Sequence, residues 1–214
     1  MPNAILTLPA SMIAVLMLLS CAVLYGTARA TVPAKDLFKS SRFESMTSYD
    51  IGLLILRLVL GLTLAAHGYN KFFCGGRIPG TARWFESIGM KPGTFHATVA
   101  ATTEISAGLG LAAGLLTPIP AAGFVSLMMV AAWMVHRPNG FFIVKEGWEY
   151  NLVLATGAVV VATLGAGRFS LDWLIFGKNW FDSCDGLLIS VLLGFAGALG
   201  QLLIFYRPPV KKTS

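Results

Sequence analysis

Five ionisable side chains lie within or beside the apolar segments of the chain, where they could bind a ligand or carry protons. They are Arg57, His67, Lys71, Glu104 and His136. An ionisable residue inside a membrane-spanning helix is costly and usually faces the bundle interior or a water-filled cavity. These residues therefore predict a polar pocket. In it, Glu104 would carry protons, and His67 or His136 would hydrogen-bond a ligand carbonyl such as that of a quinone.

The same residues also support a purely structural interpretation. Arg57 begins a stripe whose members follow at helical steps of four or three and so share one helix face: Gly61, Leu64, Gly68 and Lys71. Glu104 lies midway along the next apolar segment, and a rise of 1.5 Å per residue puts it about 5–10 Å from Arg57 in depth. This placement predicts a buried ion pair between Arg57 and Glu104, with Asp172 as the competing partner of Arg57.

No intrinsic metal or redox centre is predicted. His67 and His136 at matching depth would be the minimum for haem ligation, but no second pair or haem-attachment motif accompanies them. The three cysteines form no Cys-x-x-Cys, and no Gly-rich nucleotide loop is present. An electron donor would therefore have to come from a partner.

The elements that must position these residues are transmembrane helices. Of 214 residues, 56% are hydrophobic and 12% are charged, whereas a soluble domain carries about 25% charged residues. A span needs about 20 apolar residues. Six segments meet or approach that length: Ala4–Gly26, Ile51–Phe73, Phe95–Leu116, Ile119–Val135, Glu149–Ala166 and Cys184–Tyr206.

The first segment has a second interpretation, because Ala28-Arg29-Ala30 resembles a signal-peptidase site. No Lys or Arg precedes the apolar run, so a retained helix or signal anchor is favoured.

Pro118 and Pro120 predict a tight helical hairpin between the third and fourth segments. Asp172 is expected to cap a short helix near the membrane surface.

Charge sets the predicted orientation. With six spans, nine Lys and Arg residues fall on the side of the termini and six on the opposite side. This excess predicts that both termini are cytoplasmic. The net charge of +6 is distributed among short connecting segments, where it indicates contact with lipid headgroups and no nucleic-acid binding. One connecting segment, Thr81–Ile88, has the pattern of an amphipathic surface helix.

The order of these short motifs resembles that of the DoxX family of small membrane proteins. The matching residues are Arg57-Leu58, His67-Gly68, Lys71, Trp84-Phe85, Glu104, His136, Gly140-Phe141-Phe142, Glu149 and Ser170-Leu171-Asp172. The resemblance implies an all-α membrane protein with a four-helix core over residues 50–175. An N-terminal helix within residues 1–30 and a C-terminal helix with a basic tail at residues 176–214 would flank it. It also implies residence in a bacterial or archaeal cytoplasmic (inner) membrane.

Three functions follow from the resemblance and the residues together. The family is associated with quinone-linked oxidation, so the first is an accessory or anchoring subunit of an oxidoreductase or respiratory-type complex, not catalytic by itself. The second is a quinone-reactive subunit using the polar pocket. The third is a small-molecule or lipid transporter, or a chaperone for membrane proteins. The expected partners are membrane lipids and other protein subunits, and the expected cofactor is none apart from a bound quinone.

Overall fold

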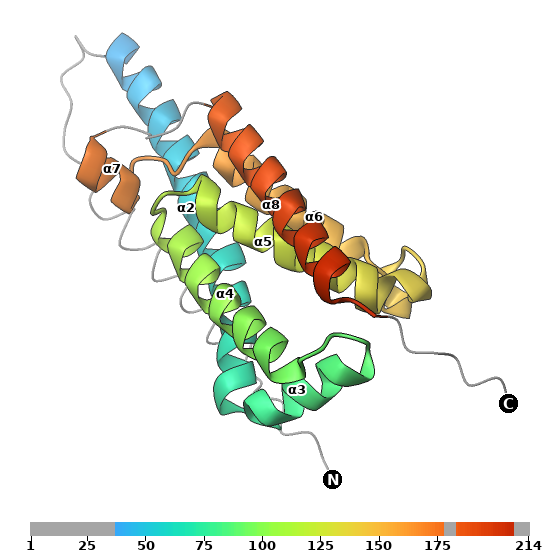
Figure 1. Ribbon diagram of the computed structural model, residues 1–214. Helices are drawn as coiled ribbons and strands as arrows, with labels where there is room; N and C mark the ends of the chain where they lie inside the picture. Colours follow the sequence, from blue (N-terminus) through green and yellow to red (C-terminus); the bar gives the residue numbers. More distant parts are fainter. Residues whose placement is uncertain (1–36, 178–182, 208–214) are drawn as a thin grey trace, which may run out of the picture. The chain divides into compact units, whose positions relative to one another are not determined.

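The computed structural model describes residues 37–177 and 183–207, and the side chains of residues 48–177 and 184–207 (Figure 1). Its helices are α2 Leu37–Phe73, α3 Arg77–Ser87, α4 Gly93–Ala113, α5 Pro118–Ala131, α6 Glu149–Leu164, α7 Leu171–Phe176 and α8 Ser183–Phe205. A π-helical turn, Ala132–His136, and two 3-10 turns, Arg137–Asn139 and Ile143–Lys145, connect α5 to α6. Regular structure in these residues is thus helical, apart from one isolated bridge between Met90 and Tyr206.

The chain divides into two compact units, Met1–Met46 and Thr47–Ser214, and the second is described here. Helix α8 belongs to this unit together with the helices of the predicted core. The predicted helix at Ala4–Gly26 lies outside the described residues.

Three helical segments among the described residues are long and apolar enough to span a membrane: Ser48–Phe73, Pro118–Asn139 and Cys184–Phe205. They coincide with three of the predicted spans. Helix α6 is apolar but has 16 residues, and α4 has 21 residues but a more polar composition. The hydroxyls of Thr98 and Thr102 on α4 donate to carbonyls one turn earlier, so the helix itself satisfies them. The complete six-span topology stays a prediction.

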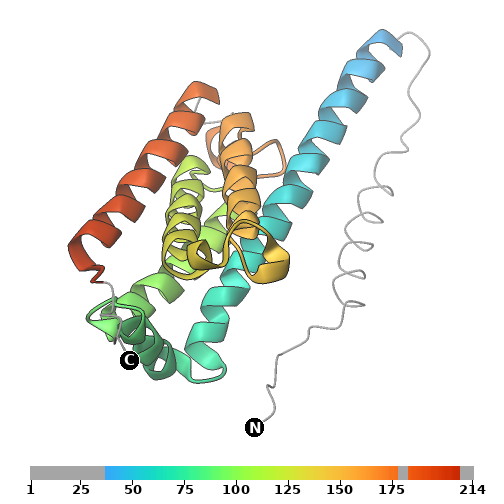
Figure 2. The ribbon, with the colours of Figure 1, turned by 90° about the vertical axis from the view of Figure 1, so that its right-hand side faces the viewer.

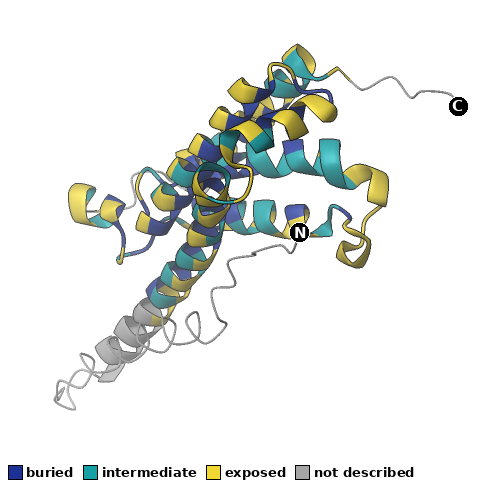
Figure 3. Ribbon diagram, turned by 90° about the horizontal axis from the view of Figure 1, so that it is seen from below, coloured by how far each residue is buried: buried dark blue, intermediate teal, exposed yellow. Residues whose placement is uncertain are grey.

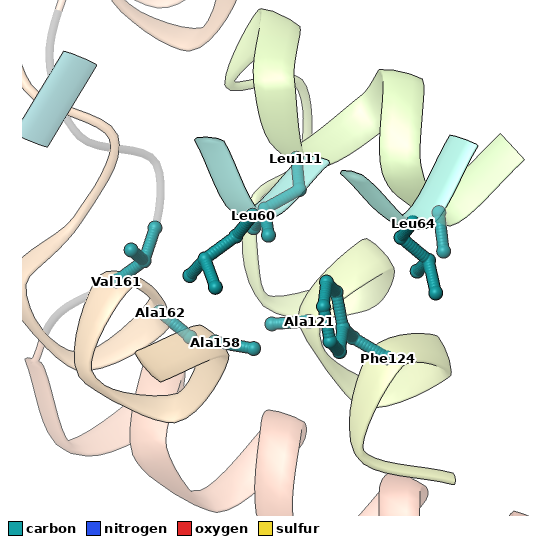
Figure 4. Close-up of a cluster of buried hydrophobic side chains, with 9 residues drawn as sticks. Leu60, Leu64, Leu111, Ala121, Phe124, Ala158, Val161 and Ala162 are labelled. Atoms are coloured by element: carbon teal, nitrogen blue, oxygen red, sulfur yellow. The ribbon is translucent and has the colours of Figure 1, made fainter. Parts of the chain in front are cut away.

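The interior of the unit is an apolar cluster to which four helices contribute (Figure 4). Leu60 and Leu64 come from α2, Leu111 from α4 and Phe124 from α5, while α6 adds small residues such as Ala158. Because lipid is as apolar as these side chains, helix association depends on close packing and not on hydrophobic burial alone.

Glycines make that close packing possible between α2 and α4. A Cβ on Gly61 would overlap the backbone of Gly108 and Ala112, and a Cβ on Gly68 would lie 2.6 Å from the carbonyl oxygen of Ala101. These contacts fix the register of the two helices: residue 61 lies beside residue 108, and residue 68 beside residue 101.

The predicted hairpin is present, since α4 ends at Gly114 in the left-handed conformation and α5 begins at Pro118. The predicted surface helix is also present as α3. Its Phe85 is buried against α4 together with Ala82 and Met90, while the neighbouring Trp84 is exposed. This face of α3 is therefore covered by protein at Phe85 and open at Trp84.

Helix α8 packs along α5 and α6, as the views in Figures 1 and 2 show. Gly186 of α8 approaches the carbonyl of Ala162, and Gly194 approaches Val125. Its C-terminal end is held at the α3–α4 turn, where the Arg207 amide donates to the Gly89 carbonyl at 2.8 Å. Burial follows these contacts, and the outer faces of the helices remain exposed (Figure 3).

Candidate functional site

Glu104 forms its ion pair with Lys71. The Lys71 Nζ lies 2.6 Å from both carboxylate oxygens of Glu104, and the two side chains are 22% and 11% exposed. The predicted pair between Arg57 and Glu104 is therefore wrong.

Helix geometry explains the correction. Helical side chains lean toward the N-terminus of their own helix. The register of α2 and α4 places Glu104 between Arg57 and Lys71 in depth. On antiparallel helices, Lys71 and Glu104 then lean toward one another, whereas Arg57 leans away from Glu104.

Arg57 instead lies fully buried at the other end of the bundle. Its Nη2 donates to the carbonyl oxygen of Phe169, while Nε and Nη1 have no hydrogen-bond partner among the described residues. The guanidinium lies against Gly114, where a Cβ would stand 2.9 Å from the Arg57 Cζ. The carboxylate of Asp172 is close enough to interact with it electrostatically.

Asp172 closes the α4–α5 turn. Its carboxylate accepts hydrogen bonds from the amides of Leu116 and Thr117, at 2.7 and 3.1 Å, and from the Thr117 hydroxyl at 2.9 Å. Its own amide donates to the carbonyl of Gly114. The cap of α7 is the hydroxyl of Ser170, which accepts from the Trp173 amide. Asp172 therefore does not cap α7 as expected, and its carboxylate binds the turn that precedes α5.

Two residues that sequence reasoning missed complete this polar junction, which joins the first turn of the Ser48–Phe73 span of α2, the α4–α5 turn and the α6–α7 connection. The Asp50 carboxylate accepts a hydrogen bond from the backbone amide of Arg168 at 2.9 Å. Its second oxygen lies 3.8 Å from the Nε of the Arg168 side chain. The Tyr49 hydroxyl donates to the carbonyl of Leu164 at 2.8 Å. The signal that could have indicated them is their place at the first turn of the span, where polar side chains meet the connections of neighbouring helices.

The three histidines occupy three different environments. His67 is exposed on α2. His136 is half-buried at the end of the π-helical turn, and its Nδ1 lies 2.7 Å from the carbonyl oxygen of Glu146, to which it donates. His96 is fully buried, with Nδ1 3.3 Å from the Gln201 amide of α8 and Nε2 without a partner in the described part of the chain.

Aromatic rings surround His96, which the predicted pocket did not include. The ring centroids of Phe95 and Phe205 lie 5.1 and 4.8 Å from that of His96 in edge-to-face arrangements, and Phe85 lies 6.1 Å away. The signal available in the sequence was a histidine flanked by Phe95 at the start of an apolar segment. The aromatic contributions from α3 and α8 are long-range and could not be seen there.

The five predicted pocket residues therefore separate into three places. Lys71 and Glu104 form one pair, with His67 one turn before Lys71 on α2. Arg57 is fourteen residues from Lys71, about 21 Å along the helix. His136 belongs to the α5–α6 connection. Among the residues that the structure describes, no three His, Cys, Asp or Glu side chains are grouped so as to hold a metal ion.

Comparison with known proteins finds relatives of the chain by sequence. A sequence model of the DoxX family matches residues 52–137. Putative oxidoreductase CatD of Bacillus subtilis is 30% identical over 129 residues, which cover 60% of this chain and 90% of CatD. Inner membrane protein YqjF of Escherichia coli is 25% identical over 131 residues, covering 61% of this chain and 96% of YqjF. Uncharacterized membrane protein Rv3486 of Mycobacterium tuberculosis is 29% identical over 130 residues, which cover 56% of this chain and 78% of Rv3486. No solved structure matches the chain significantly.

Proposed function

The chain belongs to the DoxX family of membrane proteins, and on that premise we propose that it is an accessory, anchoring subunit of a membrane oxidoreductase. The observation that carries the proposal is the use of its intramembrane charges. Lys71 and Glu104 bond to one another across α2 and α4, and Arg57 binds a backbone carbonyl. Charges used in this way hold helices together, and the reacting groups would then belong to a partner.

The names of two relatives connect the family with redox chemistry and with a membrane, and we propose that a partner supplies the redox chemistry for this chain. CatD carries the description of an oxidoreductase in its name, and YqjF is named an inner membrane protein. A common role would combine the two: a membrane-resident chain that works with a redox enzyme.

The outer face of α8 is the proposed docking surface for the enzyme. Helix α8 lies beyond the residues matched by the family model, and 17% of its most apolar stretch is buried, against 39% for α2 and 33% for α5. Large side chains such as Leu199 and Leu203 are exposed there, with the small Ala196 and Gly200 beside them. Small residues let a second helix approach closely in a membrane.

Gly200→Leu tests this surface with little effect on the fold, because no atom lies within 4 Å of the Cβ position at Gly200. Gly52→Leu, at an equally open position on α2, is the matched control. We expect oxidoreductase activity to co-purify in mild detergent with the native chain and with Gly52→Leu, and to fall at least tenfold with Gly200→Leu. Recovery of the native chain without any redox activity would contradict the accessory role.

The proposed orientation places both termini in the cytoplasm. Reporter fusions at the C-terminus distinguish the two sides. A cytoplasm-dependent reporter should be active, and a periplasm-dependent one inactive. The opposite pattern would reverse the assignment.

A quinone-reactive role is a second candidate, which His96 favours. A buried imidazole N–H without an acceptor costs about 1–3 kcal/mol, and a ligand carbonyl would satisfy it. In the tautomer in which Nδ1 accepts from the Gln201 amide, Nε2 would carry the proton and lack an acceptor. Mass spectrometry of natively extracted protein should find a bound quinone that His96→Phe reduces at least tenfold. Equal quinone content in both proteins, or none in the native one, would exclude this site.

A further inference from the structure

The connection between α5 and α6 carries a run of exposed apolar side chains. Phe141, Phe142, Ile143 and Val144 are 39%, 62%, 50% and 86% exposed. The burial of all four in lipid would be worth about 0.8 kcal/mol per methylene equivalent, so their exposure to water would be unfavourable. Trp148 packs under Phe141, with ring centroids 4.8 Å apart, and holds the run in place.

Much of the backbone of this connection is hydrogen-bonded within it. The amides of Lys145 and Gly147 donate to the carbonyl of Phe142, and those of Trp148 and Glu149 donate to the carbonyls of Gly140 and Phe141. Lipid-exposed irregular backbone is excluded from the hydrocarbon core, so this backbone belongs at the membrane interface, where water reaches its remaining amides.

Side chains add further internal bonds. The Glu149 carboxylate accepts from the Ile143 amide at 2.9 Å. His136 and Asn139 both donate to the carbonyl of Glu146, at 2.7 and 3.3 Å. The connection is thus closed at its base by polar bonds and open to the outside through its apolar tip.

The length of α6 places this tip at the membrane. Sixteen residues span about 24 Å, which is shorter than the hydrocarbon core of about 30 Å. Gly157 of α6 packs on Leu60 of α2, so Glu149, eight residues earlier, is level with about Gly68 along the helix axes. Because α2 continues to Phe73, α6 begins about 7 Å short of the end of α2.

Two cations flank the tip. The Arg137 guanidinium stacks on the Trp133 ring at 4.0 Å, and Lys145 directly follows Val144. Cations beside an apolar insertion suit the phosphate level of a phospholipid bilayer.

We propose that the Phe141–Val144 run is a lipid-inserted anchor: its side chains enter the headgroup and acyl boundary of the leaflet where α6 begins, while its backbone stays at the interface. The occupant of this surface is phospholipid, with Arg137 and Lys145 at the phosphates. The inserted run completes the span that α6 is too short to make alone.

Depth-dependent fluorescence quenching tests the proposal. Val144→Cys is labelled with bimane in a chain whose Cys21, Cys74 and Cys184 are replaced by serine, in phosphatidylcholine and phosphatidylglycerol vesicles. The references are Lys91→Cys, in the exposed α3–α4 turn, and Leu193→Cys, on the lipid-facing side of α8. Thermal unfolding of each labelled chain confirms that it is folded.

We expect lipid carrying a doxyl group at carbon 5 to quench the label at residue 144 at least threefold more than the label at residue 91. Iodide should show the reverse order. Iodide quenching at residue 144 equal to that at residue 91 would overturn the proposal, because the tip would then lie in water. Protection from both quenchers would also overturn it, because protein would then cover the tip.

Discussion

Gly114→Ala should disrupt the polar junction at the α4–α5 turn. Gly114 has φ of +65°, a left-handed conformation that costs an L-residue with a side chain about 1–2 kcal/mol. An alanine Cβ there would lie 2.7 Å from the Cβ of Ser170 and 2.9 Å from the Cζ of Arg57, both too close for van der Waals contact. The guanidinium of Arg57 would have to leave its position.

The expected loss combines two terms. Displacement of Arg57 breaks its hydrogen bond to the Phe169 carbonyl, and a bond from a charged donor contributes about 1.5–3 kcal/mol. Together with the backbone strain, the free energy of unfolding should fall by about 3–5 kcal/mol. At about 2–4 °C per kcal/mol for a chain of this size, the midpoint of thermal unfolding should fall on the order of 10 °C.

Thermal unfolding in mild detergent measures this loss. Gly52→Ala is the control, since its Cβ meets nothing within 4 Å, and it should leave the midpoint unchanged or slightly raised. In the double variant with Arg57→Leu, the two losses should be less than additive, because both act on one contact. A Gly114→Ala midpoint within about 2 °C of the native value, or full additivity with Arg57→Leu, would refute the reasoning.

Three further predictions concern the helix contacts. Lys71→Met alone should lower the free energy of unfolding by about 3–5 kcal/mol, because it leaves the Glu104 charge buried without its partner. The double variant Lys71→Met with Glu104→Met should recover most of this loss. Chemical unfolding in detergent measures both variants, and a double variant no more stable than Lys71→Met would contradict the pairing. Asp172→Ala should cost about 2–5 kcal/mol, since two amides and a hydroxyl lose their acceptor, and a native-like melting curve would exclude its role at the turn. Gly61→Ala should reduce the yield of folded protein, whereas Gly200→Ala should not, and equal yields would argue against the close α2–α4 crossing.

The side-chain lean that decides the partner of Glu104 is itself a property of the sequence, given the direction of each helix. Depth alone favoured neither cation strongly, because the register places Glu104 between them. The N-terminal tilt of helical side chains on antiparallel spans favours Lys71 over Arg57 only once Glu104 is placed between the two cations in depth. The missing quantity was the register, which depends on the contact of Gly61 with Gly108.

The polar junction shows what local patterns do not contain. Asp172 is 56 residues from Leu116, and Asp50 is 118 residues from Arg168. Each carboxylate accepts hydrogen bonds from backbone amides of a connecting segment. Which segment it binds depends on the connection that the fold places beside it. The surroundings of His96 likewise come from α3, α4 and α8 together.

The sequence by itself determined the helical class, the membrane setting, the α4–α5 hairpin, the presence of α3 and the resemblance to the DoxX family. These depend on runs of apolar residues, on proline and glycine at fixed positions, and on short motifs, all of which act within a few turns of one helix. The tertiary structure alone decided that Glu104 pairs with Lys71, that Asp172 binds the α4–α5 turn, that His96 is enclosed by aromatic rings, and that the Phe141–Val144 run faces outward. Each of these outcomes depends on the register and rotation of helices relative to one another. Close packing of small residues sets both, and hydrophobicity does not distinguish between the alternatives.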